Sequence, residues 1–213
     1  MYIAMADNYL EKRMEDYRNQ PPAKRRVATL QKLLRASRSY RGYDSKFVVR
    51  PDQLHRIIEV ATLCPSARNQ QVLRFRPVTH EEAHKILPHI RLGGALPELN
   101  LPFAGTEPNA FVVICSTVEE SHYVSVDLGI VAQSMLLQAT EIGLGGICIG
   151  AFERKAIKES LALPYDPLLV VAIGRPAEHI ELVTVDEGTP LSYYREGGVH
   201  YVPKIKTEDL IIK

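Results

Sequence analysis

The sequence predicts an α+β fold, because its helical and strand-like segments do not follow the strict strand–helix–strand order of a doubly wound sheet. Two continuous apolar runs, residues 109–117 and 168–174, are short enough to be buried strands. Between them, apolar residues recur at helical spacing from Asp127 to Ile142, and Gly143 suits the position just beyond a helix end. At 213 residues the chain fits one generous domain with a sizeable core.

The first part of the chain is predicted to be mainly helical. Paired prolines interrupt the first helix and Pro51 opens the third, because proline breaks a helix interior but fits a first turn. A later helix carries the capping-box pair Thr79 and Glu82 at its start. In order, the expected elements are helices at 1–19, roughly 27–37 and 51–64, a strand at 72–78 and a helix at 79–87.

The second part begins with the long central helix, for which Asp127 is the expected N-cap. The glycine-rich segment that follows, residues 145–152, is expected to be a strand or an extended turn. A short helix should cover 153–163 and end at the next proline. The tail, residues 199–213, begins extended and is expected to leave the body of the protein.

Composition narrows the cellular setting and the partners. A formal net charge of +1 gives no global attraction for nucleic acid or for an anionic membrane. The three cysteines lie far apart and form no CxxC pair, which favours a reducing compartment. No signal-peptide pattern is present, and no apolar run approaches the ~20 residues of a membrane span. We therefore expect a cytoplasmic protein that binds neither nucleic acid nor membrane.

The sequence HEEAH at residues 80–84 matches a zinc-peptidase pattern. In that pattern His80 and His84 would bind zinc while Glu81 acts as general base. The predicted capping box would instead place the motif in an exposed first turn, Pro88 shortens the helix, and no third ligand is evident. No metal site is expected, and a zinc hydrolase remains the remote alternative.

Three other segments offer ligand chemistry. Arg38 and Arg41 enclose a hydroxyl residue just after a predicted helix, so two guanidinium forks could bind a phosphate, although a basic surface turn is the competing interpretation. The stretch at 65–71 carries more hydrogen-bonding side chains than a turn requires. The glycines at 143–150 follow a helix, which argues against a dinucleotide-binding loop, but they would let a planar ligand approach the main chain closely.

Taken together, five segments resemble the FMN-dependent nitroreductase family in their order and spacing. The resemblance spans nearly the whole chain from about residue 29. It implies a mixed β-sheet flanked by helices, an intertwined homodimer with FMN in the interface, and a C-terminal tail that reaches the partner. The segments are SRSYRGY at 37–43, PSARNQQVLRF at 65–75, the long helix and glycine stretch at 127–152, VVAIGRPAE at 170–178 and HYVPK at 200–204.

The resemblance also implies a function. Family enzymes transfer a hydride from NADH or NADPH through bound FMN to a nitroaromatic, quinone or similar small acceptor, with ping-pong kinetics. The flavin carries this chemistry, so no side chain is expected to be catalytic. A flavin-binding storage or regulatory protein without efficient turnover is the alternative from another class.

The cofactor-binding residues implied by the family fall into four groups. The first would hold the phosphate and the adjacent ribityl or pyrimidine edge, and the second would reach the flavin from the other subunit. The third group would offer its main chain to the flavin ring. The fourth, near the C-terminal end of the sequence, would bring positive charge to the phosphate. The residues are Arg38, Ser39 and Arg41; Pro65, Ser66, Ala67, Asn69 and Gln71; Cys148, Ile149, Gly150 and Ala151; and Lys204 and Lys206.

The chain departs from the family pattern at three positions and at its start. Ser37 stands where the family commonly has an arginine, which removes one expected phosphate contact. Val72 and Leu73 replace a Pro-Trp pair, which bears on the substrate wall. Residues 1–26 have no family counterpart and are assigned to an N-terminal helical extension, while 27–213 form the FMN-binding domain. The pattern leaves open the physiological substrate and the choice between NADH and NADPH.

Overall fold

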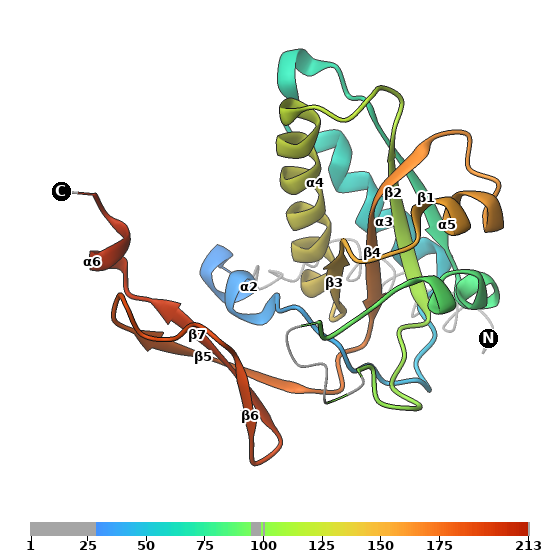
Figure 1. Cartoon of the computed structure of the whole chain (residues 1–213). Coiled ribbons are helices and arrows are strands. Elements are labelled where there is room, and N and C mark those ends of the chain that lie inside the picture. The colour runs from blue at the N-terminus through green and yellow to red at the C-terminus, as the bar shows by residue number, and fades with distance from the viewer. Residues whose placement is uncertain (1–28, 95–98, 100, 213) are drawn as a thin grey trace, which may run out of the picture.

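The structure, a computed structural model, describes residues 29–94, 99 and 101–212. The predicted helix at 1–19 and the extension at 1–26 lie outside the described residues. Figure 1 shows a body, in which helices surround a sheet, and an arm formed by the C-terminal segment that projects away from it.

The body is built on a four-stranded sheet with the order β1-β2-β4-β3 and antiparallel pairing throughout. The two apolar runs predicted as buried strands are confirmed as its central strands, and every residue of β2 is buried. The mixed pairing expected from the family is absent among these four strands, whereas the sheet of the arm is mixed and Ser39 forms an isolated parallel bridge with Gly146 in the body. The strands are β1 (Leu73–Val78), β2 (Ala110–Ser116), β3 (Gly145–Ile149) and β4 (Asp166–Gly174).

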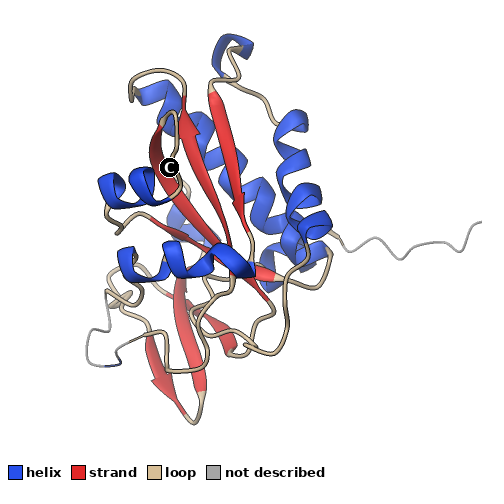
Figure 2. Cartoon of the chain, turned by 90° about the vertical axis from the view of Figure 1, so that its right-hand side faces the viewer, coloured by secondary structure: helices blue, strands red, loops and turns tan. Residues whose placement is uncertain are grey.

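Helices cover both faces of this sheet (Figure 2). Alternate residues of β2 supply two separate apolar clusters, as the two-residue period of a strand requires. Val112 and Ile114 pack with α3 and α4 residues, whereas Phe111 and Val113 pack with α5 and with Ala83 of the 3-10 turn at His80–Lys85. The helices of the body are α2 (Leu30–Ala36), α3 (Pro51–Glu59), α4 (His122–Glu141) and α5 (Arg154–Ser160), with 3-10 turns η1 (Val60–Leu63) and η2 (Ala67–Asn69).

The long helix α4 starts earlier than the sequence predicted. Ser121 is its N-cap, and its hydroxyl accepts the backbone N–H of Val124 at 3.3 Å. The assignment of Asp127 as N-cap is wrong, since this residue lies one turn inside the helix and is buried. The predicted end is confirmed: Gly143 has φ +79° and the N–H of Leu144 donates to the carbonyl of Ala139 at 2.8 Å.

The segment predicted as a helix at 79–87 forms two 3-10 turns instead, η3 (His80–Lys85) and η4 (Leu87–His89). The expected capping box does not form, because the Glu82 carboxylate is used elsewhere. It accepts hydrogen bonds from Arg76 on β1 at 2.7 Å and from Lys85 at 2.9 Å. Ion pairing to the neighbouring strand thus outweighs the local capping signal.

The arm contains a second sheet and a short helix. Its strand order is β5-β7-β6, with β5 parallel to β7 and β6 antiparallel to it. The extended start of the tail is confirmed by β7, whereas β5 and β6 were not predicted from the sequence. Their bounds are β5 (His179–Val185), β6 (Tyr194–Glu196), β7 (Val199–Ile205) and α6 (Thr207–Leu210). Among the described residues, no helix is both long and apolar enough to cross a membrane.

Candidate functional site

Residues 65–71, here called the polar knot, have an unusual backbone. Arg68, Asn69 and Gln71 have φ values of 52°, 54° and 49°, in the left-handed region that residues other than glycine rarely adopt. Each such residue costs on the order of 1–3 kcal/mol unless its surroundings enforce it. Strain of this kind concentrates at ligand sites, so the backbone itself supports the interpretation of the knot as a binding element.

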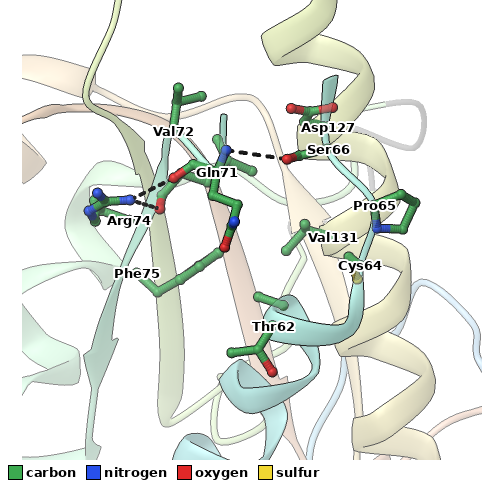
Figure 3. Close-up of a pocket in the computed structure, with 12 residues that line it drawn as sticks. Thr62, Cys64, Pro65, Ser66, Gln71, Val72, Arg74, Phe75, Asp127 and Val131 are labelled. Carbon is green, nitrogen blue, oxygen red and sulfur yellow. Dashed lines mark hydrogen bonds between the residues drawn. The ribbon is translucent and has the colours of Figure 1, made fainter. Parts of the chain in front are cut away.

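Hydrogen bonds to α4, within the knot and from Arg74 hold the knot in this conformation. The backbone N–H of Ala67 donates to the buried carboxylate of Asp127 on α4, at 2.9 and 3.2 Å to its two oxygens. The backbone N–H of Gln71 donates to the Ser66 hydroxyl at 3.2 Å, and the Gln71 side chain donates to Asn69 Oδ1 at 3.0 Å. Arg74 closes the segment by donating to the Gln71 carbonyl at 2.8 Å (Figure 3).

The knot forms one wall of a pocket of about 130 Å³. Sites that enclose a drug-sized ligand are usually ~300–1,000 Å³, so this pocket alone is too small for a whole flavin. Figure 3 shows Gln71 on one side of the pocket, and Pro65 and Ser66 beside Asp127 and Val131 on the other. Its lining residues are Ala61, Thr62, Cys64, Pro65, Ser66, Gln71, Val72, Leu73, Arg74, Phe75, Asp127 and Val131.

The two residues that replace the family's Pro-Trp pair belong to the core. Val72 and Leu73 are both buried and pack in the cluster between the sheet and helices α3 and α4. Val72 also lines the pocket. The change from Pro-Trp therefore gives this wall of the pocket a smaller, aliphatic surface.

Residues 38–42, here called the arginine segment, follow α2 and run beside β3. Ser39 forms a parallel bridge with Gly146, and the N–H of Tyr40 donates to the Gly146 carbonyl at 3.2 Å. On the other side, the backbone N–H groups of Arg41 and Gly42 both donate to Glu178 Oε1, the latter at 3.1 Å. The segment is thus held by two distant parts of the chain.

Both guanidinium groups of this segment keep spare donors. Arg38 donates to the Leu34 carbonyl, and Arg41 donates to the Ser39 carbonyl at 2.9 Å. The Nε atoms of both arginines are buried and lack a hydrogen-bond partner among the described residues. Burial lowers the pKa of Arg38, although the group stays protonated at neutral pH. Unpaired buried N–H donors of this kind suit an anionic ligand.

The glycines after α4 have two different roles. A Cβ on Gly145 would meet the Tyr40 ring at 2.6 Å, and a Cβ on Gly146 would meet the Ala172 carbonyl at 2.2 Å. These two are therefore required for packing, and the expectation that they expose main chain to a ligand is wrong. Gly150 is exposed, and a Cβ there would meet nothing within 4 Å, so a planar ligand could approach its backbone.

The other residues predicted for the site lie along β3 and in the arm. Cys148 and Ile149 end β3, with Cys148 exposed and Ile149 buried, and Ala151 follows on the surface. Lys204 is exposed on β7. Lys206 contacts the carboxylates of Asp186 at 2.6 Å and Asp209 at 3.6 Å, and the Asp186 contact raises its pKa.

One chain does not gather all these groups at one place. The arginine segment adjoins the start of β3, whereas the knot adjoins Asp127 near the N-terminal end of α4. At 1.5 Å per residue, the helix axis between Asp127 and Gly143 is about 24 Å long. Among the described residues, the two segments therefore occupy opposite ends of α4, and a single protomer presents two separate candidate half-sites.

Sequence reasoning missed two residues that shape these half-sites, Asp127 and Glu178. The sequence indicated Asp127 only as a helix N-cap. Glu178 ends the family-like segment at 170–178, to which no role was assigned. What marks both residues is a buried carboxylate, and burial cannot be read from the sequence alone.

The zinc-like motif gains no support from its geometry. In a 3-10 turn successive residues are about 120° apart, so His80 and His84 do not share one face as they would on an α-helix. Glu81 accepts a hydrogen bond from Thr79. The part of the chain that the structure describes contains no group of three or more His, Cys, Asp or Glu residues that could hold a metal ion.

Comparison with known proteins gives consistent matches. The model of the nitroreductase family matches residues 34–175. A provisionally named NADH dehydrogenase/NAD(P)H nitroreductase of Archaeoglobus fulgidus is 27% identical over 166 residues, which cover 73% of this chain and 90% of that protein.

Solved structures agree. An FMN-dependent nitroreductase of Clostridium difficile R20291 is 25% identical with a TM-score of 0.55, covering 70% of this chain and 89% of its own. An NADPH:FMN oxidoreductase of Vibrio harveyi, solved with NAD+, is 24% identical with a TM-score of 0.54, covering 70% of this chain and 69% of its own.

Proposed function

This chain belongs to the nitroreductase family, and we propose that it is an oxidoreductase that uses bound FMN to pass two electrons from NADH or NADPH to a small acceptor. The acceptor class is a nitroaromatic, a quinone or a similar oxidised ring. The observation that carries the proposal is the polar knot, whose strained backbone is held by hydrogen bonds, one set of them to the buried Asp127 carboxylate, beside a pocket. The names of the matched proteins are consistent with it.

The residues present fit FMN chemically. Arg38 and Arg41 have buried, unpaired Nε donors for the phosphate or the pyrimidine edge. The exposed backbone at Gly150 and Ala151 leaves room for a planar ring. When bound, FMN would supply the centre that accepts and returns a hydride. Arg41 would stabilise negative charge on the pyrimidine edge as preorganised donors do at an oxyanion.

Lys206 fits less well than Lys204. Its ammonium is already engaged with Asp186 and Asp209 in the arm, so it would need to leave both carboxylates to reach a phosphate. Lys204 is exposed and has no ion pair among the described residues. We therefore assign to Lys204 the positive charge that the C-terminal region would bring to the FMN phosphate.

We also infer that the functional unit is a homodimer in which each cofactor contacts both chains. The two half-sites at opposite ends of α4 support this arrangement, because a second copy could bring a knot to an arginine segment. The arm leaves the body (Figure 1). It ends in apolar side chains that are exposed in the protomer, namely Leu210, Ile211 and Ile212. Obligate interfaces of this kind commonly exceed ~2,000 Å².

The experiment that tests the proposal combines a spectrum with turnover. The protein as purified, or after incubation with FMN, should show the absorption bands of oxidised flavin, and NADH or NADPH should bleach them anaerobically. Addition of menadione or a nitrofuran should restore the bands and sustain NAD(P)H oxidation. Bound flavin without turnover would favour a storage role, and a protein that refuses FMN would reject the proposal.

A further inference from the structure

The carboxylate of Glu178 joins the arginine segment to the arm. Glu178 lies just before β5, and its side chain is only 9% exposed. Oε1 accepts the backbone N–H groups of Arg41 and Gly42, and Oε2 accepts Arg195 Nη2 at 2.5 Å. Arg195 belongs to β6. One buried side chain therefore contacts both the loop expected at the cofactor and strand β6 of the arm.

The surroundings of this carboxylate are cationic and aromatic. The Arg41 guanidinium lies 5.2 Å from the centre of the Tyr193 ring, and Tyr193 lies 5.0 Å from the His200 ring. His200 is 1% exposed, and burial, followed by Arg195 and Arg41, lowers its pKa. Removing the Glu178 charge would thus leave the Arg195 guanidinium without its carboxylate partner.

We propose that Glu178 is a positioning residue of the cofactor site, which docks the arm onto the arginine segment so that both are ordered as one unit. The part that concerns FMN rests on the proposed function. The docking itself is a property of this chain, because it depends only on contacts between Glu178, the arginine segment and Arg195.

The direction in which replacing Glu178 changes FMN binding distinguishes a positioning role from a purely electrostatic one. If Glu178 only damped the positive field, replacing it would strengthen attraction for a phosphate through Coulomb's law. If it positions the segment, replacement weakens binding. Glu178→Gln suits this test, because the amide oxygen can still accept the N–H groups of Arg41 and Gly42. Its NH₂ group would face the donors of Arg195, so the link to the arm breaks.

Titration of FMN into the flavin-free protein, followed by flavin fluorescence, measures the effect. We expect Glu178→Gln and Arg195→Gln each to raise the FMN Kd about tenfold, and the double variant to be no worse than either, since both break one link. Glu82→Gln is the matched control, because Glu82 also accepts from two cationic side chains but lies on η3. Its Kd should equal that of the wild type. Unchanged or tighter binding in Glu178→Gln would overturn the proposal.

Hydrogen exchange of the flavin-free protein keeps the test independent of the cofactor. Glu178→Gln should raise amide exchange about tenfold in both residues 38–43 and strands β6 and β7, while β2 and β4 stay protected. Wild-type exchange in those segments would refute the docking role even if FMN binds. If the wild type refuses FMN while exchange rises as expected, the cofactor assignment fails and the docking stands. Arg195→Gln, at the more exposed partner, repeats the test if the Glu178 variant does not fold.

Discussion

The polar knot and the arginine segment are both expected to face the cofactor, yet they are held in different ways. The knot is fixed by contacts within residues 66–74 and by a single buried carboxylate, Asp127, on the neighbouring helix. The arginine segment is fixed by Gly146 on β3 and by Glu178 at the root of the arm.

This difference has a consequence for order and strain. The knot stores left-handed backbone strain and needs only the body of the protein to enforce it. The arginine segment has an ordinary backbone conformation, but its position depends on the packing of the Tyr40 ring against Gly145 and on the docking of the arm. We therefore expect perturbations around Asp127 to affect the knot alone, and perturbations of β3 or of the arm to affect the arginine segment alone.

The largest effect should come from Asp127→Ala. The substitution removes the buried carboxylate that accepts the half-buried N–H of Ala67, so the free energy of unfolding should fall by about 3 kcal/mol. Asp127→Asn, which keeps an acceptor oxygen, should lose about half as much. Urea denaturation measures both, and a loss below about 0.5 kcal/mol for the alanine variant would show that the knot does not need this carboxylate.

Gly145→Ala should disturb the arginine segment without touching the knot. The added Cβ would lie 2.6 Å from the Tyr40 ring and 2.7 Å from Pro176, so overpacking should cost about 2 kcal/mol. Gly150→Ala is the control, since its Cβ meets nothing within 4 Å. Thermal and urea denaturation of the two variants compare them, and equal stability would contradict the assigned packing role.

Arg41→Ala should weaken FMN binding more than it weakens the fold. Loss of a charge-assisted hydrogen bond costs roughly 1.5–3 kcal/mol, which corresponds to about a ten- to hundredfold rise in Kd. Arg41→Lys should recover only part of the affinity, because an ammonium cannot form the planar two-pronged contact. Flavin fluorescence titration gives both values. Unchanged affinity in both variants would leave the arginine segment a surface feature.

The smallest effect concerns pH and the arm. Burial lowers the pKa of His200, so the folded protein keeps this ring neutral while the unfolded chain protonates near its usual pKa of about 6.5. Its contribution to stability is therefore complete above about pH 6.5 and declines as the pH falls below that value. Urea unfolding at pH 7.5 and 5.5 should show a smaller loss in His200→Gln than in the wild type. An equal loss of stability in the variant and the wild type would mean that another group is responsible for the pH dependence.

Periodicity and apolar runs predicted the body of the fold. The runs in β2 and β4 and the stripe along α4 depend on burial in one core, which a local pattern records directly. The start of α4 was missed because its first turn, residues 122–126, is largely exposed and the apolar stripe becomes regular only after Asp127. Strands β5 and β6 were missed because they are largely exposed and lack a clear apolar alternation.

The site was predictable at the level of residue type, but its geometry was not. Two arginines just after a helix and a cluster of amide side chains can be identified from the sequence as groups that could bind a ligand. The contacts that hold them join Ala67 to Asp127 and Gly42 to Glu178, across long separations in the chain. Only the tertiary structure brings such pairs together, and it also shows that Gly145 and Gly146 serve packing.

The measurement that tests the account most directly is subunit complementation. Arg41→Ala impairs one half-site and Asn69→Ala impairs the other, so each purified variant should bind FMN weakly. After the two are mixed and allowed to exchange subunits, each heterodimer should contain one site with both segments intact. About a quarter of all sites should then bind FMN with wild-type affinity, as expected for a two-fold symmetric interface. If one chain supplied both segments, mixing would restore no tight binding, and the shared site would be wrong.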